Sequence, residues 1–126
     1  GLRKSEIAPN LHRNSQNMAD LSQFDPNSAG NPNNNIFGLP FTEEDAALVL
    51  LPVPWEVTVS YGAGTARAAE HIFKSSLQVD LFDPDCLDMW RKGYFMKDVD
   101  KKLLLKSDYL RKEAELFIDY ISKGDL

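Results

Sequence analysis

The sequence is poor in the residues that bind metals or form disulfides, with one cysteine and two histidines among its 126 residues. The single cysteine, Cys86, cannot form an internal disulfide, which is typical of a reducing compartment and predicts a cytoplasmic protein. A nucleophilic role for this thiol would require a base close by, so we favour an ordinary thiol. We expect His12 to be a solvated residue of a polar arm and His71 to be a half-exposed helix residue, not metal ligands.

Excess positive charge and long apolar runs are also absent. The net charge is −5 and the isoelectric point is near 4.9, so no basic stripe is present to neutralise the phosphates of a nucleic acid. The same charge balance gives no support for binding to an anionic membrane surface. No run approaches the ~20 apolar residues of a membrane span, and the first residues lack the apolar centre of a signal peptide. We therefore predict no nucleic-acid partner and no membrane partner.

Apolar residues are scarce in the first forty positions. We predict an irregular N-terminal arm over residues 1–40, followed by an α/β region over residues 41–126. Residues 1–17 show no periodicity and precede Met18, where the sequence reads like a natural start, so they are either an added leader or a native extension. The Pro, Gly and Asn content of residues 20–35 predicts a loop. Two apolar pairs in this arm are expected either to dock on the parent domain or a neighbouring subunit, or to be incidental to a flexible arm. These pairs are Leu21 with Phe24 and Ile36 with Phe37.

The stretch from Leu48 to Phe82 predicts a strand, a loop, a helix and a second strand. Its first apolar run, Leu48–Val53, does not alternate, which is typical of a strand buried on both faces of a parallel sheet. A helix is expected to begin after Gly64 with Thr65 as its N-cap, and Val79–Leu81 is predicted to be the second strand. The inward face of the helix is predicted to carry Ala69, Ile72, Phe73 and Ser76. A strand, a crossover helix and a parallel strand together indicate the α/β class.

The last third of the chain predicts one long helix after an irregular region. The apolar and aromatic patch between Leu87 and Met96 either covers a sheet edge or faces a partner. An amphipathic helix is expected over Lys97–Leu126, with Ser107–Asp108 as a cap where the helix restarts and Gly124 as its C-terminal glycine. Its apolar face is predicted to carry Leu103, Leu110, Ala114, Phe117, Ile118 and Ile121.

The residues around the first predicted strand resemble a known family. Leu50–Arg67, LLPVPWEVTVSYGAGTAR, together with Asn35–Pro40, NIFGLP, is similar to the N-terminal part of the ureohydrolase superfamily, and most similar to its agmatinase-like branch. The positions that match the family's loop are Pro54, Ser60, Tyr61, Gly64, Thr65 and Arg67. Where the family continues with Gly-Pro, this chain has Ala68-Ala69, which removes a proline that would preorganise the first turn of the helix. The resemblance implies that residues 41–126 are the N-terminal β-α-β part of a three-layer αβα, arginase-like parallel sheet.

The resemblance also implies a function. Ureohydrolases hydrolyse the guanidinium C–N bond of agmatine, arginine, guanidine or a related guanidino compound and release urea, using two divalent metal ions, usually manganese, with nickel as the alternative. Their His and Asp ligands come from Gly-Gly-Asp-His, Asp-Ala-His-x-Asp and Asp-x-Asp-x-x-Asp-Pro motifs. Gln78–Pro84 copies the last of these apart from Gln78, and we interpret it as coincidence because no His-bearing motif precedes it. We therefore predict no catalytic residue and no metal ligand in this chain. It would be the N-terminal segment of a subunit that the remainder of the ureohydrolase chain completes. These subunits would form a homo-oligomer, a trimer or hexamer.

Any direct contribution to function is expected in the loop Pro52–Gly64, because ligands of open α/β sheets bind outside the carboxyl ends of strands. An aromatic face and a carboxylate suit a planar guanidinium cation. The predicted substrate-mouth residues are Trp55, Glu56, Ser60, Tyr61 and Arg67. The alternative is structural, with Trp55 packed under the loop and Glu56 capping backbone groups or pairing with Arg67. The glycines lack the spacing of a phosphate-binding loop, so we predict no nucleotide site.

Two classes of function remain open. In the first, the chain is the N-terminal segment of an amidinohydrolase and supplies sheet, substrate-mouth loop and oligomer contacts. In the second, it is a small protein without enzymatic activity that acts through binding or oligomer assembly. A reading frame that continues into a Gly-Gly-Asp-His motif would favour the first.

Overall fold

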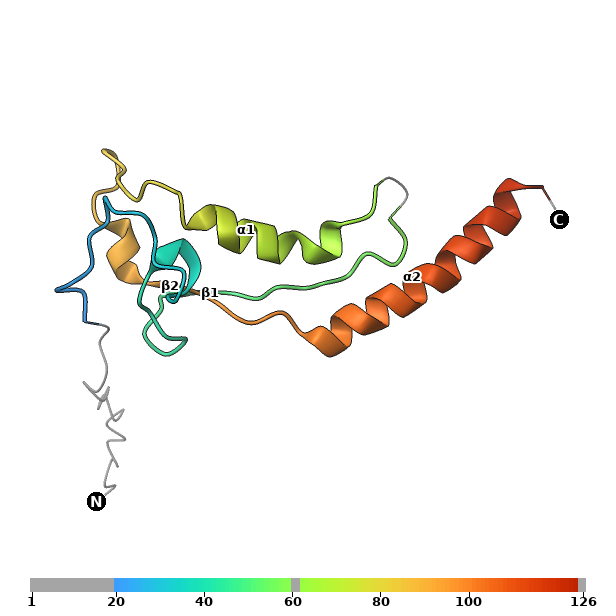
Figure 1. The fold of residues 1–126 in the computed structure, drawn as a ribbon, viewed down its shortest axis with the longest axis horizontal. Helices are drawn as coiled ribbons and strands as arrows, with labels where there is room; N and C mark the ends of the chain where they lie inside the picture. The colour runs from blue at the N-terminus through green and yellow to red at the C-terminus, as the bar shows by residue number, and fades with distance from the viewer. Residues whose placement is uncertain (1–19, 60–61, 125–126) are drawn as a thin grey trace, which may run out of the picture.

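The computed structural model describes residues 20–59 and 62–124, so the prediction for residues 1–17 lies outside it. In the described part of the chain, two helices and a two-stranded parallel sheet form an elongated α/β structure (Figure 1). The regular elements are β1 (Leu48–Leu50), α1 (Ala68–Ser76), β2 (Tyr94–Met96) and α2 (Lys101–Ser122). Single turns of 3-10 helix form η1 (Ile36–Gly38), η2 (Thr65–Arg67) and η3 (Met89–Lys92). The predicted α/β class is confirmed, and the arginase-like three-layer arrangement stays a prediction.

The second strand lies later in the chain than predicted. β1 pairs in parallel with β2, whereas Val79–Leu81 forms no strand. Two aspartates turn the chain in that region through side-chain acceptors that compete with strand pairing. Asp80 accepts a hydrogen bond from the backbone N–H of Phe82 at 2.9 Å. Asp83 accepts one from the backbone N–H of Asp85, also at 2.9 Å. The crossover from β1 to its parallel partner therefore includes α1 and the irregular segment that follows it.

β1 is only partly covered in the described structure, since Val49 is 37% exposed and Leu50 is half-buried, so the prediction of a strand buried on two sides is wrong for these residues. Leu48 is 48% exposed, and Leu51, just past the strand, is 70% exposed. The strand also ends at Leu50, short of Val53, and Pro52 in this segment has no N–H to donate to a neighbour. No other described strand pairs with the far edge of β1. An apolar strand with partly open faces and an open edge is typical of a surface that packs against further protein.

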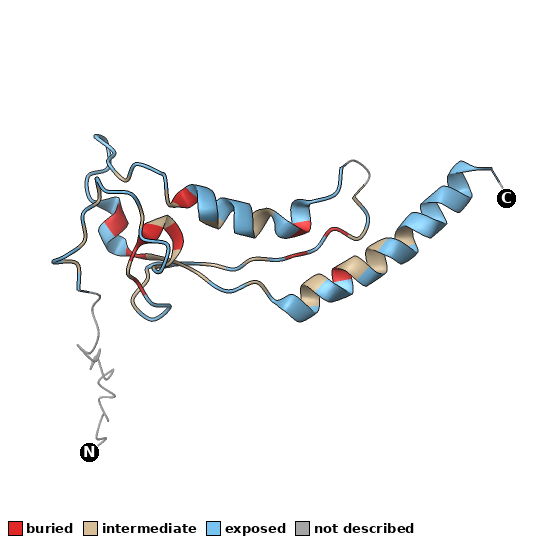
Figure 2. Ribbon diagram, in the orientation of Figure 1, coloured by how far each residue is buried: buried red, intermediate tan, exposed pale blue. Residues whose placement is uncertain are grey.

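The apolar core lies at one end of the molecule, where the arm meets η3 and β2 (Figure 2). Leu39, Phe41 and Trp90 are buried there, and Leu21 and Phe24 are half-buried against them. The ring centroids of Phe24 and Trp90 are 4.8 Å apart, within the range of favourable aromatic pairs. The described part of the arm therefore docks on its own domain, as one of the two alternatives predicted.

Asn35 closes the outer edge of β2 with its side-chain amide. Its Oδ1 accepts hydrogen bonds from the backbone N–H groups of Met96 at 2.6 Å and Ile36 at 2.8 Å. Its Nδ2 donates to the carbonyl of Met96 at 3.1 Å. The amide thus takes the place that a neighbouring strand would occupy at Met96. Nearby, the backbone N–H of Phe37 donates to Oγ of Ser76 at 2.9 Å, which joins the arm to α1.

Two glycines let the arm lie directly against itself and against the end of α1. A Cβ atom on Gly38 would lie 2.5 Å from Cα of Gly30, and Gly38 has a φ of +69°. The backbone N–H of Gly30 donates to the carbonyl of Leu77 at 2.9 Å. No other residue type combines this positive φ with the absence of a side chain.

α1 begins later than predicted. Thr65 is the first residue of η2 and not an N-cap, and α1 itself starts at Ala68. Ser76 is buried and Phe73 is half-buried, as predicted for the inward face. Ile72 is 55% exposed, so the predicted inward face is only partly covered by the described residues.

α2 begins at Lys101 and not at Lys97, because Asp100 caps it. The Asp100 carboxylate accepts two backbone N–H groups of the first turn, which is a standard N-cap arrangement. The helix runs without a break through Ser107, so the predicted restart there is wrong. Gly124 follows the helix with a φ of +71°, which confirms the predicted C-terminal glycine.

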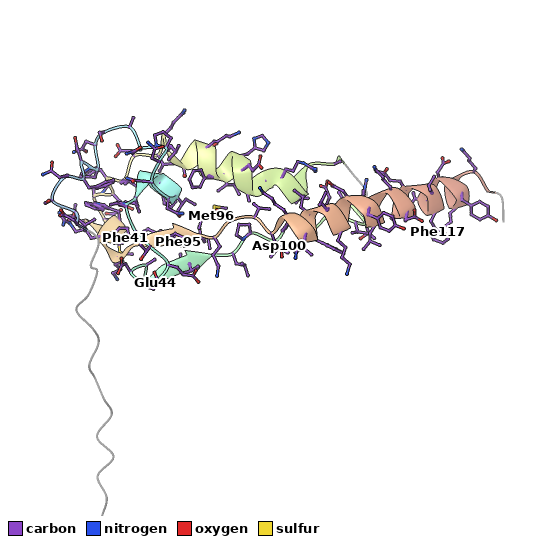
Figure 3. All side chains as sticks on the ribbon, turned by 60° about the horizontal axis from the view of Figure 1, so that its bottom comes forward. Phe41, Glu44, Phe95, Met96, Asp100 and Phe117 are labelled. Carbon is purple, nitrogen blue, oxygen red and sulfur yellow. The ribbon has the colours of Figure 1, made fainter. Side chains whose placement is uncertain are left out.

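The apolar face of α2 is covered over its first half only. Leu103, Leu110 and Ala114 are half-buried. Phe117 is exposed and lies far along the helix from the β2 residues Phe95 and Met96 (Figure 3). In the described part of the chain, neither helix has the length and apolar character required to cross a membrane.

Replacing Gly38 with alanine should destabilise the fold, because the new Cβ would collide with the Gly30 backbone and the positive φ would be strained. We expect the free energy of unfolding to fall by about 3 kcal/mol. Gly62→Ala is the matched control, since Gly62 has a φ of +63° and, among the described residues, no atom is recorded within 4 Å of the added Cβ. Its cost should be about 1 kcal/mol. Equal losses for the two variants in chemical denaturation would contradict the backbone contact.

Candidate functional site

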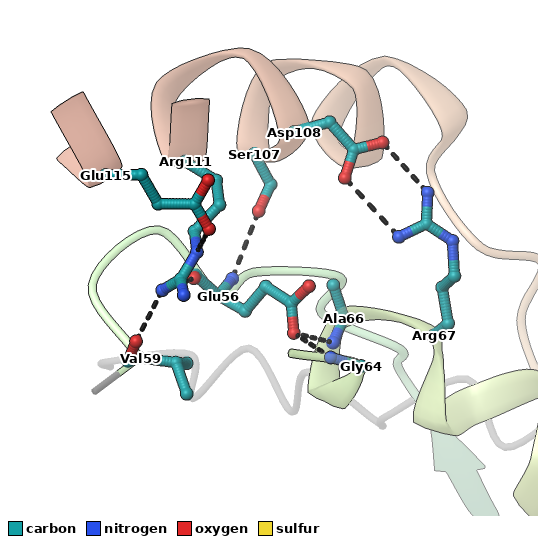
Figure 4. A network of polar contacts seen from close by, with 9 residues as sticks. All are labelled: Glu56, Val59, Gly64, Ala66, Arg67, Ser107, Asp108, Arg111 and Glu115. Atoms are coloured by element: carbon teal, nitrogen blue, oxygen red, sulfur yellow. Dashed lines mark hydrogen bonds and ion pairs between the residues drawn. The ribbon is translucent and has the colours of Figure 1, made fainter. Parts of the chain in front are cut away.

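The candidate site is the segment that leaves the carboxyl end of β1 and leads into α1. It passes beside the first half of α2, and the two are joined by a network of polar contacts (Figure 4). Such a position, after the carboxyl end of a parallel strand, is where α/β proteins place their ligand-binding loops.

Trp55 is held between two buried neighbours while its own side chain faces solvent. Pro54 is fully buried and Glu56 is 6% exposed, whereas Trp55 is 41% exposed. The backbone N–H of Trp55 donates to the carbonyl of Val53 at 2.9 Å, which forms a tight turn at this point. The indole is therefore open and does not pack under the loop, and the backbone that carries it is fixed on both sides.

Glu56 supplies the cap that the start of the helical segment otherwise lacks. Its Oε2 accepts hydrogen bonds from the backbone N–H of Gly64 at 2.8 Å and of Ala66 at 3.2 Å. These are the unpaired donors of a helix N-terminus, which attract negative charge. The hydrogen bond from Gly64, followed by that from Ala66, lowers the pKa of the Glu56 carboxyl below its usual value of 4.5. Of the predicted structural alternatives, Glu56 adopts the one in which it caps backbone groups.

Two residues of α2 hold the backbone of the same segment. Ser107 is completely buried, and its Oγ accepts the backbone N–H of Glu56 at 3.0 Å. The guanidinium of Arg111 donates through Nη1 to the carbonyl of Val59 and, at 3.5 Å, to that of Glu56. Its Nε donates to Glu115 at 2.8 Å. The loop is thus fixed to α2 by backbone groups on both sides of Val57.

Arg67 also contacts α2. Its two terminal nitrogens donate to the carboxylate oxygens of Asp108 at 2.9 and 3.4 Å. The hydrogen bond to Asp108 raises the pKa of the Arg67 guanidinium. The pair is partly exposed to solvent, so its contribution to stability is small. Its main effect is orientation, since a bidentate pair fixes the end of η2 relative to α2.

The structure brings three of the five predicted site residues into one neighbourhood. Glu56 and Arg67 belong to the network, and Trp55 adjoins it. Ser60 and Tyr61 lie outside the described residues. The partners on α2 were missed by sequence reasoning. Ser107 could have been identified as a contact residue, because it is a small polar residue on the otherwise apolar face of the helix.

A shallow groove of about 350 Å³ lies elsewhere, between α1 and the segment after β2. Two of its polar side chains are engaged, since the Asn35 amide binds Met96 and the Lys97 ammonium pairs with Glu43 at 2.9 Å. Three further charged residues line it, namely Glu70, Lys74 and Asp98. We place the candidate site at the loop because it follows the carboxyl end of a parallel strand, where α/β proteins bind their ligands.

Within residues 20–59 and 62–124, no group of three or more His, Cys, Asp or Glu side chains is arranged to hold a metal ion. His71 and Cys86 are both exposed. The arrangement around Glu56 is thus suited to fixing a loop and presenting Trp55, and it contains no metal centre among the described residues.

Comparison of the chain with protein-family models, with curated proteins and with solved structures found no match in any of the three.

The Glu56 cap should make the stability of this region depend on acidic pH. Because the pKa of Glu56 is lowered in the folded state, its contribution is fully present above the usual value of 4.5 and is lost as the pH falls through the lowered pKa. We expect the difference in free energy of unfolding between wild type and Glu56→Gln to shrink as the pH falls from about 6 to about 3. Chemical denaturation across this range measures it. A constant difference would contradict the charged cap.

Proposed function

We propose that these residues are the N-terminal part of a metal-dependent amidinohydrolase of the ureohydrolase superfamily, in its agmatinase-like branch. The substrate would be agmatine, arginine, guanidine or a related guanidino compound, and the product would be urea. The observation that carries the proposal is the loop after β1. It resembles the family's loop at six positions and departs from it at Ala68-Ala69. Its ends are fixed while it presents an open indole at the carboxyl end of a parallel strand.

The open surfaces of the sheet support the larger fold that this proposal requires. Leu48 and Leu51 are exposed, and the far edge of β1 has no strand beside it among the described residues. A three-layer αβα domain would cover both faces of β1 and add strands at that edge. The apolar residues at the far end of α2, such as Phe117, would be covered by the remainder of the chain or by other subunits of a trimer or hexamer.

The residues described do not fit a two-metal site. In the proposed enzyme, two divalent ions, manganese or alternatively nickel, would be bound by side chains outside these residues, and we assign no step of hydrolysis to the groups described. The proposed task of the loop is substrate binding. The face of Trp55 would contact the guanidinium cation, which an aromatic quadrupole attracts. Ser60 and Tyr61 are proposed as hydrogen-bonding residues of the same mouth.

A second candidate function is a non-catalytic protein that acts in binding or oligomer assembly. The observation that favours it is the large exposed apolar surface on β1 and α2, which is of the kind that protein partners cover. The two proposals differ in whether urea is formed.

The first test is the intact mass, metal content and urea release of the natural protein. We expect a mass above the 14.2 kDa of these residues, about two divalent ions per chain, and urea release from a guanidino compound that a chelator abolishes. Agmatine, arginine and guanidine are the compounds to assay. A protein of 14.2 kDa with no urea release would contradict the enzyme and leave the binding or assembly role.

Trp55 should contribute to substrate affinity in the active protein. We expect Trp55→Ala to raise KM by about tenfold, because a desolvated cation–π contact contributes about 1–2 kcal/mol. Trp55→Phe is the control that keeps an aromatic face, and its KM should rise by about threefold or less. Steady-state kinetics of urea release measures both. An unchanged KM in Trp55→Ala would remove Trp55 from the substrate mouth.

A further inference from the structure

We infer that Arg111 of α2 is a positioning residue for the substrate-mouth loop. The inference rests on the proposed function for the identity of the ligand, a guanidino compound, but the contacts that carry it are those of the described residues. Arg111 would act through the backbone of the loop, without touching the substrate itself.

The donors of Arg111 point to the backbone of the loop. Through Nη1 the guanidinium donates to two backbone carbonyls of the loop, those of Val59 and Glu56. These residues already form a turn, since the N–H of Val59 points to the carbonyl of Glu56 at 3.5 Å. The Arg111 side chain is only 17% exposed, so it is packed between the loop and the helix. One side chain of α2 thus binds both ends of a turn more than fifty positions earlier in the sequence.

The loop is also closed at its base. The Glu56 carboxylate binds the backbone N–H groups of Gly64 and Ala66, and Ser107 binds the N–H of Glu56. Together with the contacts of Arg111, these bonds fix the loop at its start, at Val59 and at its end. The rigid backbone beside Trp55 therefore depends on α2 as much as on the loop itself.

The charge of Arg111 is balanced by a neighbour on the same helix. A guanidinium beside the mouth would repel a cationic guanidino substrate, but Glu115 binds Nε of Arg111 at 2.8 Å and balances its charge. The same bond orients the planar fork toward the loop carbonyls. Lysine keeps the positive charge but has a single nitrogen on a flexible stem, so it cannot reproduce this set of contacts. Arg111→Lys therefore removes the contacts that position the loop while it keeps the positive charge.

The experiment compares Arg111→Lys and Arg111→Ala with a matched control in the natural full-length protein. The control is Lys112→Gln, which changes the neighbouring exposed residue of the same helix. Two quantities are measured: hydrogen–deuterium exchange at the amides of Val59, Gly64 and Ala66, and kcat and KM for urea release from agmatine, arginine and guanidine. In both Arg111 variants we expect exchange at Val59 to be at least about tenfold faster, KM to rise by about tenfold and kcat to stay within about twofold. The control should change none of these.

Each other outcome overturns a defined part of the inference. Unchanged exchange in both Arg111 variants would show that Arg111 does not position the loop. Faster exchange with an unchanged KM would show that the loop it positions is not a substrate contact. Absence of urea release from the wild-type protein would overturn the proposed function and the substrate assignment with it, while the exchange rates would still report separately whether Arg111 fixes the loop. If Arg111→Ala fails to fold, Arg111→Lys provides the same comparison with the charge retained.

Discussion

The carboxylate of Glu56 is the constraint on which the arrangement of loop and helices depends. It lies among unpaired backbone N–H groups at the start of the helical segment, and its own peptide N–H is bound by Ser107 of α2. One residue therefore connects the strand exit, the start of η2 and the first half of α2. A buried acid in this setting is kept ionised mainly by backbone hydrogen bonds, and the positive charge of Arg111 adds to their effect.

The sequence was sufficient to predict a helix after Gly64, a long helix in the last third of the chain and a strand that begins at Leu48, because each has a local pattern of apolar residues. The predicted caps at Thr65 and Ser107 were wrong. It was insufficient for β2. Three residues, Tyr94–Met96, carry no measurable periodicity, and their pairing depends on β1 and on the Asn35 amide about sixty positions away. Val79–Leu81 has the alternation of a strand, but nearby aspartates bind the backbone and turn it. Parallel pairing is a non-local property that short alternation does not encode.

In the candidate site, too, local features could be predicted from the sequence and non-local contacts could not. Trp55 and Glu56 were predicted as substrate-mouth residues because aromatic and acidic side chains after a strand suit a cation. The role of Trp55 stays a prediction, and Glu56 adopts the predicted structural alternative as a cap. Their partners were not predicted, because Ser107 and Arg111 lie on a helix more than fifty positions later. An amphipathic pattern identifies which face of α2 is apolar. It does not indicate that a serine on that face binds a specific peptide group.

The Asn35 amide has a consequence for how the sheet grows. A sheet extends only where an unpaired strand edge is free, and at Met96 the arm occupies the outer edge of β2. The far edge of β1 carries no such cover among the described residues. Strand addition is therefore directional: any further strand, from the same polypeptide or from another molecule, is guided to the β1 side. The short turn that carries Asn35 therefore ends the sheet on the β2 side.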